Sequence, residues 1–91
     1  MIVHMKYLAP LRFTLGKKTG VIEIPDRDTA TVWELLEYVA KNEPRFLKVA
    51  ALDRESILNK ITVLVENKLC GLDSTVPDGA NVILMSPISG G

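Results

Sequence analysis

The stretch TVWELLEYVAKN, residues 31–42, carries the clearest helical pattern in the chain. Its apolar side chains recur at the spacing of one helix face, which is typical of a helix with a single buried stripe. The members of this stripe are Val32, Leu35, Leu36 and Val39. Thr31 and Glu34 have the spacing of a capping box. Because Pro44 disfavours a helix in the residues before it, we expect the helix to end near Asn42.

Two strand patterns precede this helix. Residues 2–8 alternate between apolar and polar side chains and end before Pro10. We expect their buried face to hold Val3, Met5, Tyr7 and Ala9. Residues 11–16 have the composition of a turn or of a short helix. Residues 21–24 form a second strand pattern, which we expect to pair with the first as a hairpin with a long loop.

Three further strand patterns follow the helix. Residues 61–65 are an apolar, largely β-branched run that is typical of a central strand. Residues 69–72 have the pattern of a short strand, and residues 77–79, Pro-Asp-Gly, predict a turn before a last strand at residues 81–85. Between the helix and these strands, residues 45–60 fit one or two helical turns followed by a loop.

The order of elements is therefore strand, strand, helix, strand, short strand, strand. A lone amphipathic helix needs a partner for its apolar stripe, and one face of a sheet supplies it. We predict an α+β protein of the ubiquitin-like β-grasp type, a mixed sheet packed on one main helix. Residues 1–86 form the domain, and residues 87–91 form a flexible C-terminal tail that ends in two glycines, which have the largest backbone freedom.

Composition narrows the classes of function. The chain has 91 residues, enough for one small domain, and its formal net charge is zero. That balance argues against a nucleic acid or an anionic membrane held by bulk charge. A single cysteine excludes an internal disulfide and a protein-only cysteine metal site, and it suits the cytoplasm. We see no signal peptide and no membrane-spanning run, so we expect a cytoplasmic protein without a bound metal or cofactor.

Several stretches resemble the ubiquitin-like β-grasp sulfur carriers, and most closely the small subunit of molybdopterin synthase, the MoaD family. They are Leu11-Arg12 with the following Gly16, residues 65–69 (Val-Glu-Asn-Lys-Leu), residues 76–82 (Val-Pro-Asp-Gly-Ala-Asn-Val) and residues 87–91 (Pro-Ile-Ser-Gly-Gly). The resemblance covers almost the whole chain. The family differs in often having proline at the position of Ser86, a bulky aromatic residue at Met85 and an acidic residue at Phe13.

The resemblance implies a function for the tail, which consists of Pro87, Ile88, Ser89, Gly90 and Gly91. A separate E1-like adenylating enzyme would use ATP to activate the carboxylate of Gly91. Sulfur would then be added to give a thiocarboxylate, a 1-thioglycine at Gly91. The large subunit of molybdopterin synthase would use this sulfur to make molybdopterin. Since the chain lacks a glycine-rich loop with a phosphate-binding lysine, the resemblance implies a sulfur-donating subunit without catalytic machinery of its own.

The residue types of the tail suit this chemistry. Without a Cβ, Gly91 presents an unhindered carbonyl, and Gly90 allows the backbone to pass through a narrow channel. Met85 and Ile88 are candidates for docking a partner beside the tail, although Met85 fits the core equally well. Leu69 is a further docking candidate, as is Leu72, but for both of these the core is the favoured placement.

Three other functions fit the same features. One is a protein modifier like ubiquitin, in which Gly91 is joined to lysines of target proteins. Another is a sulfur carrier for thiolation of transfer RNA or for thiamine. The last is a simple β-grasp binding module, for which the two glycines have no role.

Overall fold

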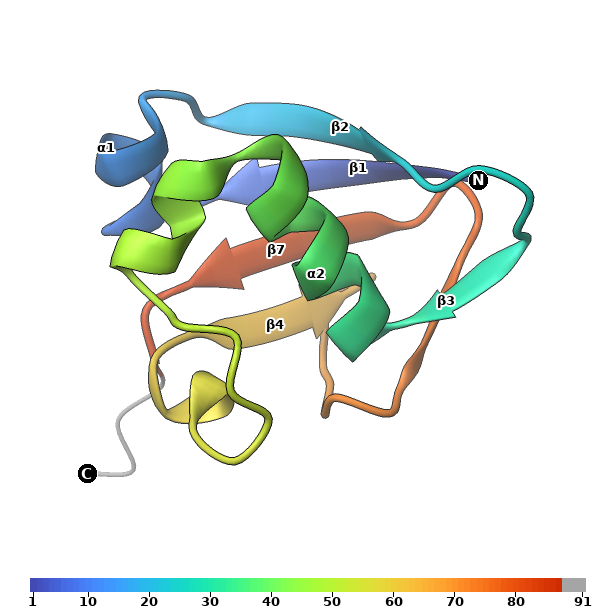
Figure 1. The fold of residues 1–91 in the computed structure, drawn as a ribbon. Helices are drawn as coiled ribbons and strands as arrows, with labels where there is room; N and C mark the ends of the chain where they lie inside the picture. The colour runs from blue at the N-terminus through green and yellow to red at the C-terminus, as the bar shows by residue number, and fades with distance from the viewer. Residues whose placement is uncertain (88–91) are drawn as a thin grey trace.

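The computed structural model describes residues 1–87. Figure 1 shows a mixed sheet with helix α2 (Val32–Asn42) lying across one face. The strand order is β2-β1-β7-β4-β5. The bounds are Ile2–Tyr7 for β1, Thr19–Glu23 for β2, Thr62–Val65 for β4, Lys68–Leu69 for β5 and Asn81–Met85 for β7. The central pair β1 and β7 is parallel and the other pairs are antiparallel, so the predicted β-grasp fold is confirmed.

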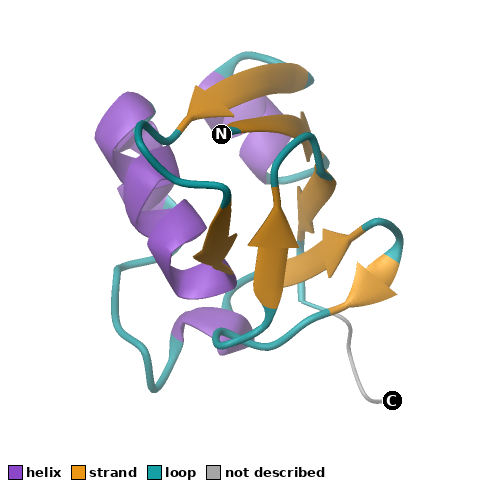
Figure 2. Cartoon of the chain, turned by 90° about the vertical axis from the view of Figure 1, so that its right-hand side faces the viewer, coloured by secondary structure: helices purple, strands orange, loops and turns teal. Residues whose placement is uncertain are grey.

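Shorter elements complete the fold. Strands β3 (Thr29–Thr31) and β6 (Thr75–Pro77) form a separate two-stranded ribbon, which faces the viewer in Figure 2. Helix α1 (Leu11–Leu15) follows β1. Two 3₁₀ helices follow α2. The first, η1 (Pro44–Lys48), agrees with the helical turns predicted there, and the second, η2 (Ile57–Asn59), lies where a loop was predicted. None of the helices in the described part of the chain is long and apolar enough to cross a membrane.

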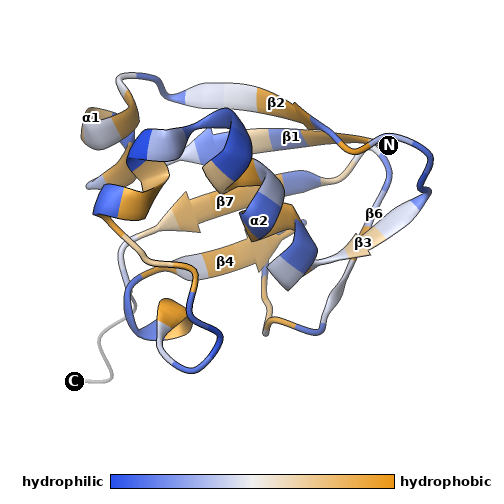
Figure 3. Cartoon of the chain, viewed as in Figure 1, coloured by the Kyte–Doolittle hydropathy of each residue, from blue (hydrophilic) through white to orange (hydrophobic). Residues whose placement is uncertain are grey.

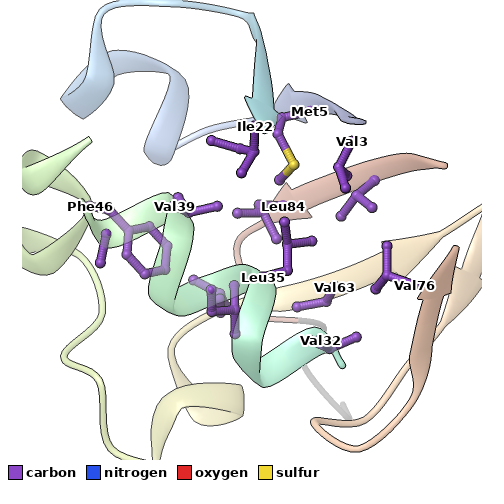
Figure 4. Packing of buried hydrophobic residues seen from close by; sticks show 14 of the residues in the cluster. Val3, Met5, Ile22, Val32, Leu35, Val39, Phe46, Val63, Val76 and Leu84 are labelled. Carbon is purple, nitrogen blue, oxygen red and sulfur yellow. The ribbon is translucent and has the colours of Figure 1, made fainter. Parts of the chain in front are cut away.

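The core lies between α2 and the sheet. Every member of the predicted stripe on α2 is buried. Figure 4 shows the stripe facing side chains that alternate along the strands. Those labelled on the sheet are Val3, Met5, Ile22, Val63 and Leu84. Figure 3 shows the same division by hydropathy, with mainly apolar central strands and hydrophilic peripheral loops. Each such buried aliphatic side chain contributes about 1.5–3 kcal/mol, so this layer dominates stability.

The capping box is confirmed at the start of α2. The Oγ1 atom of Thr31 accepts a hydrogen bond from the backbone N–H of Glu34 at 3.1 Å, and the Thr31 N–H donates to the Glu34 carboxylate at 2.9 Å. Arg27 forms an ion pair with the same carboxylate. The Thr31 N–H and then the Arg27 guanidinium hold the pKa of Glu34 below its ordinary value.

Three strand predictions need correction. Ala9 does not belong to the core, because β1 ends at Tyr7 and Ala9 is exposed in the turn that follows. The second strand begins at Thr19 rather than at Val21, since the ladder starts with a bond from the Tyr7 N–H to the Lys18 carbonyl. The short strand predicted at residues 69–72 is β5, which ends at Leu69.

Candidate functional site

The described chain ends at the root of the predicted tail. Strand β7 lies between β1 and β4, and it leads directly into Ser86 and Pro87, which are exposed. Leu84 is paired with Tyr7, and its carbonyl accepts a hydrogen bond from the Leu8 N–H at 2.9 Å. The tail therefore starts from a strand held on both sides. The other predicted tail residues, Ile88, Ser89, Gly90 and Gly91, lie outside the described residues.

An apolar strip crosses the sheet face that points away from α2. The register places Leu69 opposite Leu64, and Leu64 opposite Ile83. Met85 follows Ile83 by two residues and therefore points to the same face. Leu69 is 69% exposed, and the other three side chains are half-buried. We call these four residues, Leu64, Leu69, Ile83 and Met85, the outer strip.

The outer strip brings two of the predicted docking residues together. Met85 is half-buried at the end of β7, next to the tail root. The favoured core placement of Leu69 is wrong, because Leu69 is exposed on β5, which is the edge strand of the sheet within residues 1–87. Leu72 is partly buried and packs against the core. Ile88, the third docking candidate, lies outside the described residues.

Sequence reasoning missed Ile83 and Leu64. Each belongs to a continuous apolar run, and such runs are typical of strands buried on both faces. The available signal was that only one helix was predicted. A single helix covers only one sheet face, so every second residue of each run had to point outward.

Beside the strip, β1 and β2 make the outer face more polar. His4 and Lys6 are exposed there and, with Val21 of β2 and Ile83 of β7, line a shallow hollow. Within residues 1–87, no group of three histidine, cysteine or acidic side chains is placed to hold a metal ion. Cys70 is half-buried, with its Sγ atom 3.3 Å from the Lys68 carbonyl oxygen.

The two groups with shifted pKa values lie away from this face. Glu34 belongs to the cap of α2. Tyr7 points into the core, where burial and then the negative charge of Glu43 raise its pKa to about 12. Both pKa shifts have a structural cause, and neither Tyr7 nor Glu34 forms an acid–base pair with a residue on the outer face. The described part of the site is thus an apolar surface that ends at the tail root.

Comparisons with known proteins agree with this geometry. The family model that matches, over residues 5–91, is described as the ThiS family. A search of curated proteins by sequence finds no match. Among solved structures, SAMP1 (small archaeal modifier protein 1) from Haloferax volcanii superposes with a TM-score of 0.81 at 26% identity and covers 100% of both chains.

Two further solved structures are similar. One, from Pyrococcus furiosus, is assigned as subunit 1 of molybdopterin converting factor, with a TM-score of 0.76 at 24% identity over 97% of this chain and 99% of that chain. The other is a chain of the BexX/CysO complex from Amycolatopsis orientalis, with a TM-score of 0.73 at 22% identity over 98% of this chain and 99% of that chain. Because both identities are below 25%, these two structures support the fold alone.

Proposed function

The chain belongs to the ThiS family, and from this membership we propose that it is a sulfur carrier whose reactive group is the carboxylate of Gly91. An ATP-dependent activating enzyme binds the chain, and the Gly91 carboxylate attacks the α-phosphorus of ATP with release of pyrophosphate. Hydrosulfide from a sulfur donor then displaces AMP from the acyl adenylate and leaves a thiocarboxylate. We place this chemistry in the cytoplasm.

The observation that carries the proposal is the route of the chain from the core to the tail. Strand β7 holds Val82 and Leu84 in the core, presents Ile83 and Met85 on the outer strip and continues into Pro87. A partner that covers the outer strip therefore also fixes the point from which the tail starts. Pro87 restricts the backbone at this point, which lowers the entropy lost when the tail is bound.

We propose molybdopterin synthesis as the use of the sulfur. The support is the likeness to the Pyrococcus furiosus structure, which is assigned as a molybdopterin converting factor subunit. In this proposal the large subunit of a molybdopterin synthase contacts the outer strip and takes Gly91 into its own catalytic site. Thiolation of transfer RNA or thiamine synthesis would use the same thiocarboxylate with another acceptor.

A protein modifier is the second candidate, and a specific observation favours it. SAMP1, whose name states that it is a modifier, is similar over the full length of both chains. In this case the amine of a target lysine displaces AMP from activated Gly91 and forms an amide bond. The activating step is the same for both candidates, so the two differ only in the group that attacks the acyl adenylate.

Intact mass measurement tests both candidates. The chain is isolated from its native cells under conditions that preserve thiocarboxylates, together with a variant that lacks Gly91 and a Leu52→Ala control with an intact tail. A carrier shows a species heavier by the mass difference between sulfur and oxygen, located on Gly91 and absent only from the truncated variant. A modifier shows Gly-Gly branches on lysines of other proteins. If neither product forms although ATP and the cell extract are present, the proposal is refuted.

A further inference from the structure

Helix α1 exposes an aromatic side chain among basic ones. Phe13 is 70% exposed, and the guanidinium carbon of Arg12 lies 4.8 Å from the centroid of its ring. These two residues line a shallow hollow together with Gly16, Lys17 and Lys18 of the connection to β2. We call the side chains of Arg12, Phe13, Lys17 and Lys18 the α1 patch. A single exposed apolar side chain is common at protein surfaces, and what distinguishes Phe13 is the group of basic side chains around its ring.

The α1 patch carries more positive than negative charge. Arg12, Lys17 and Lys18 bring three positive charges, and Glu43, in an ion pair with Lys17, brings one negative charge. Within residues 1–87, neither Arg12 nor Lys18 forms an ion pair. The whole chain has no net charge, so this excess is local. A binding partner that matches the patch is therefore acidic and has an apolar group for the ring.

The α1 patch lies at the end of the sheet from which the tail starts. Strand β1 runs parallel to β7 with Tyr7 beside Leu84, and α1 follows β1 as Ser86 follows β7. Figure 1 shows α1 and the end of β7 at the same end of the molecule. Gly91 is four residues beyond Pro87, and a fully extended chain spans at most about 14 Å over that distance. An enzyme that acts on Gly91 must therefore approach this end.

We propose that the α1 patch is a docking site for an acidic segment of the activating enzyme, with an apolar side chain of that segment against Phe13. The inference rests on the proposed function. The activating enzyme is chosen because the carrier and the modifier both require it. Phe13 is the anchor of the contact, since buried aromatic side chains commonly dominate binding at interfaces. Arg12 and Lys18 attract the acidic segment and orient it.

Kinetics of activation test the inference. The activating enzyme is purified from the same cells, and the active fraction is identified by ATP–pyrophosphate exchange that depends on this chain. The kcat and KM of the exchange are then measured for variants of the chain. Phe13→Ala is matched by Leu52→Ala, which removes a 38% exposed side chain from another surface. Lys18→Gln is matched by Lys68→Gln. Lys68 pairs with Val65 of β4, and Val65 pairs with Val82 near the start of β7, so Lys68 lies at the opposite end of the sheet from the tail.

We expect Phe13→Ala to raise KM about tenfold with kcat unchanged, because the patch binds the enzyme but does not touch the reacting atoms. Lys18→Gln should raise KM about two- to threefold at low salt, and the difference should vanish at high salt. Both control variants should keep the wild-type KM. Thermal unfolding shows that each variant is folded before its kinetics are compared.

Other outcomes overturn the inference. Equal KM values for Phe13→Ala and Leu52→Ala would remove Phe13 from the interface while leaving the proposed function intact. A wild-type dimer in sedimentation that Phe13→Ala dissociates would assign the patch to a second copy of the chain. If the wild-type chain supports no exchange with any fraction of the extract, the proposed function fails, and the inference that rests on it fails too.

Discussion

Replacing Tyr7 with Phe should stabilise the protein. Tyr7 is 1% exposed, and its hydroxyl finds no hydrogen-bond partner among residues 1–87. A buried hydroxyl without a partner costs about 1–3 kcal/mol of desolvation. Phe keeps the ring, and therefore its packing beside Gly20, while it removes the polar atom. We expect the free energy of unfolding at pH 7 to rise by about 1–2 kcal/mol, or roughly 4–16 °C in the unfolding midpoint for a domain of this size.

The stabilisation should grow at alkaline pH. Burial raises the pKa of Tyr7 to about 12, so the folded state favours the neutral phenol. A raised pKa contributes stability that is complete below the ordinary pKa of 10.0 and is lost as the pH rises toward 12. A shift of this size corresponds to roughly 3 kcal/mol. Phe has no such loss, so the gap between Tyr7→Phe and the wild type should widen over this range.

Urea unfolding followed by the fluorescence of Trp33, the single tryptophan, measures both effects. The series runs from pH 7 to pH 11.5 or to the highest pH at which both proteins fold reversibly, and equal m-values show that the same surface is exposed on unfolding. Tyr38→Phe, at a half-buried tyrosine of α2, is the matched control. Destabilisation of Tyr7→Phe at pH 7 would mean that the hydroxyl has a partner. A gap that stays constant with pH would refute the link to ionisation.

Three further predictions follow from the same contacts. Hydrogen bonds lower the pKa of Glu34, so its ionised carboxylate stabilises the fold at pH values above its ordinary pKa of 4.5. The difference in unfolding free energy between the wild type and Glu34→Gln should therefore shrink as the pH falls below 4.5, which a series of urea titrations at acid pH measures. Leu84→Ala, at a fully buried position, should lower the free energy of unfolding by about 2–5 kcal/mol, and a loss below 1 kcal/mol by thermal denaturation would contradict the packing described. Leu69→Asp should change the unfolding free energy by less than about 0.5 kcal/mol, since Leu69 is exposed. The same substitution should weaken the affinity for a partner that binds the tail, as measured by calorimetry.

The sequence was sufficient for the elements whose pattern is local. The helix at residues 32–42 has its own cap and its own apolar period, so its bounds and its buried stripe agree with the structure. The ribbon of β3 and β6 was not predicted, because Thr29–Thr31 and Thr75–Pro77 are each three residues long and gain their partner only when distant parts of the chain meet. The short helix Ile57–Asn59 was not predicted for a similar reason, since the buried side chains of this segment, such as Phe46 and Ile57, are held by the rest of the fold.

The candidate site depended on register, which a pattern along one strand does not contain. The outer strip forms because Leu69, Leu64 and Ile83 lie opposite one another on three strands, and each looks like an ordinary core residue in its own segment. Phe13 was noticed only as a difference from the resembling family. Its exposure on α1 beside Arg12 comes from the structure.

In the proposed function, each partner uses a contact surface of the folded domain in addition to the tail, and strand β7 lies next to both surfaces. A partner that held only the tail would gain little contact area for the conformational entropy that the tail loses on binding. The synthase subunit proposed to bind the outer strip would fix Met85, and the activating enzyme proposed to bind the α1 patch would fix the neighbouring end of β1. With the domain held at either place, the partner would only have to place the residues after Pro87 in its own active site. In the proposed function, binding energy from the folded domain thereby lowers the entropy lost when the Gly91 carboxylate enters the active site.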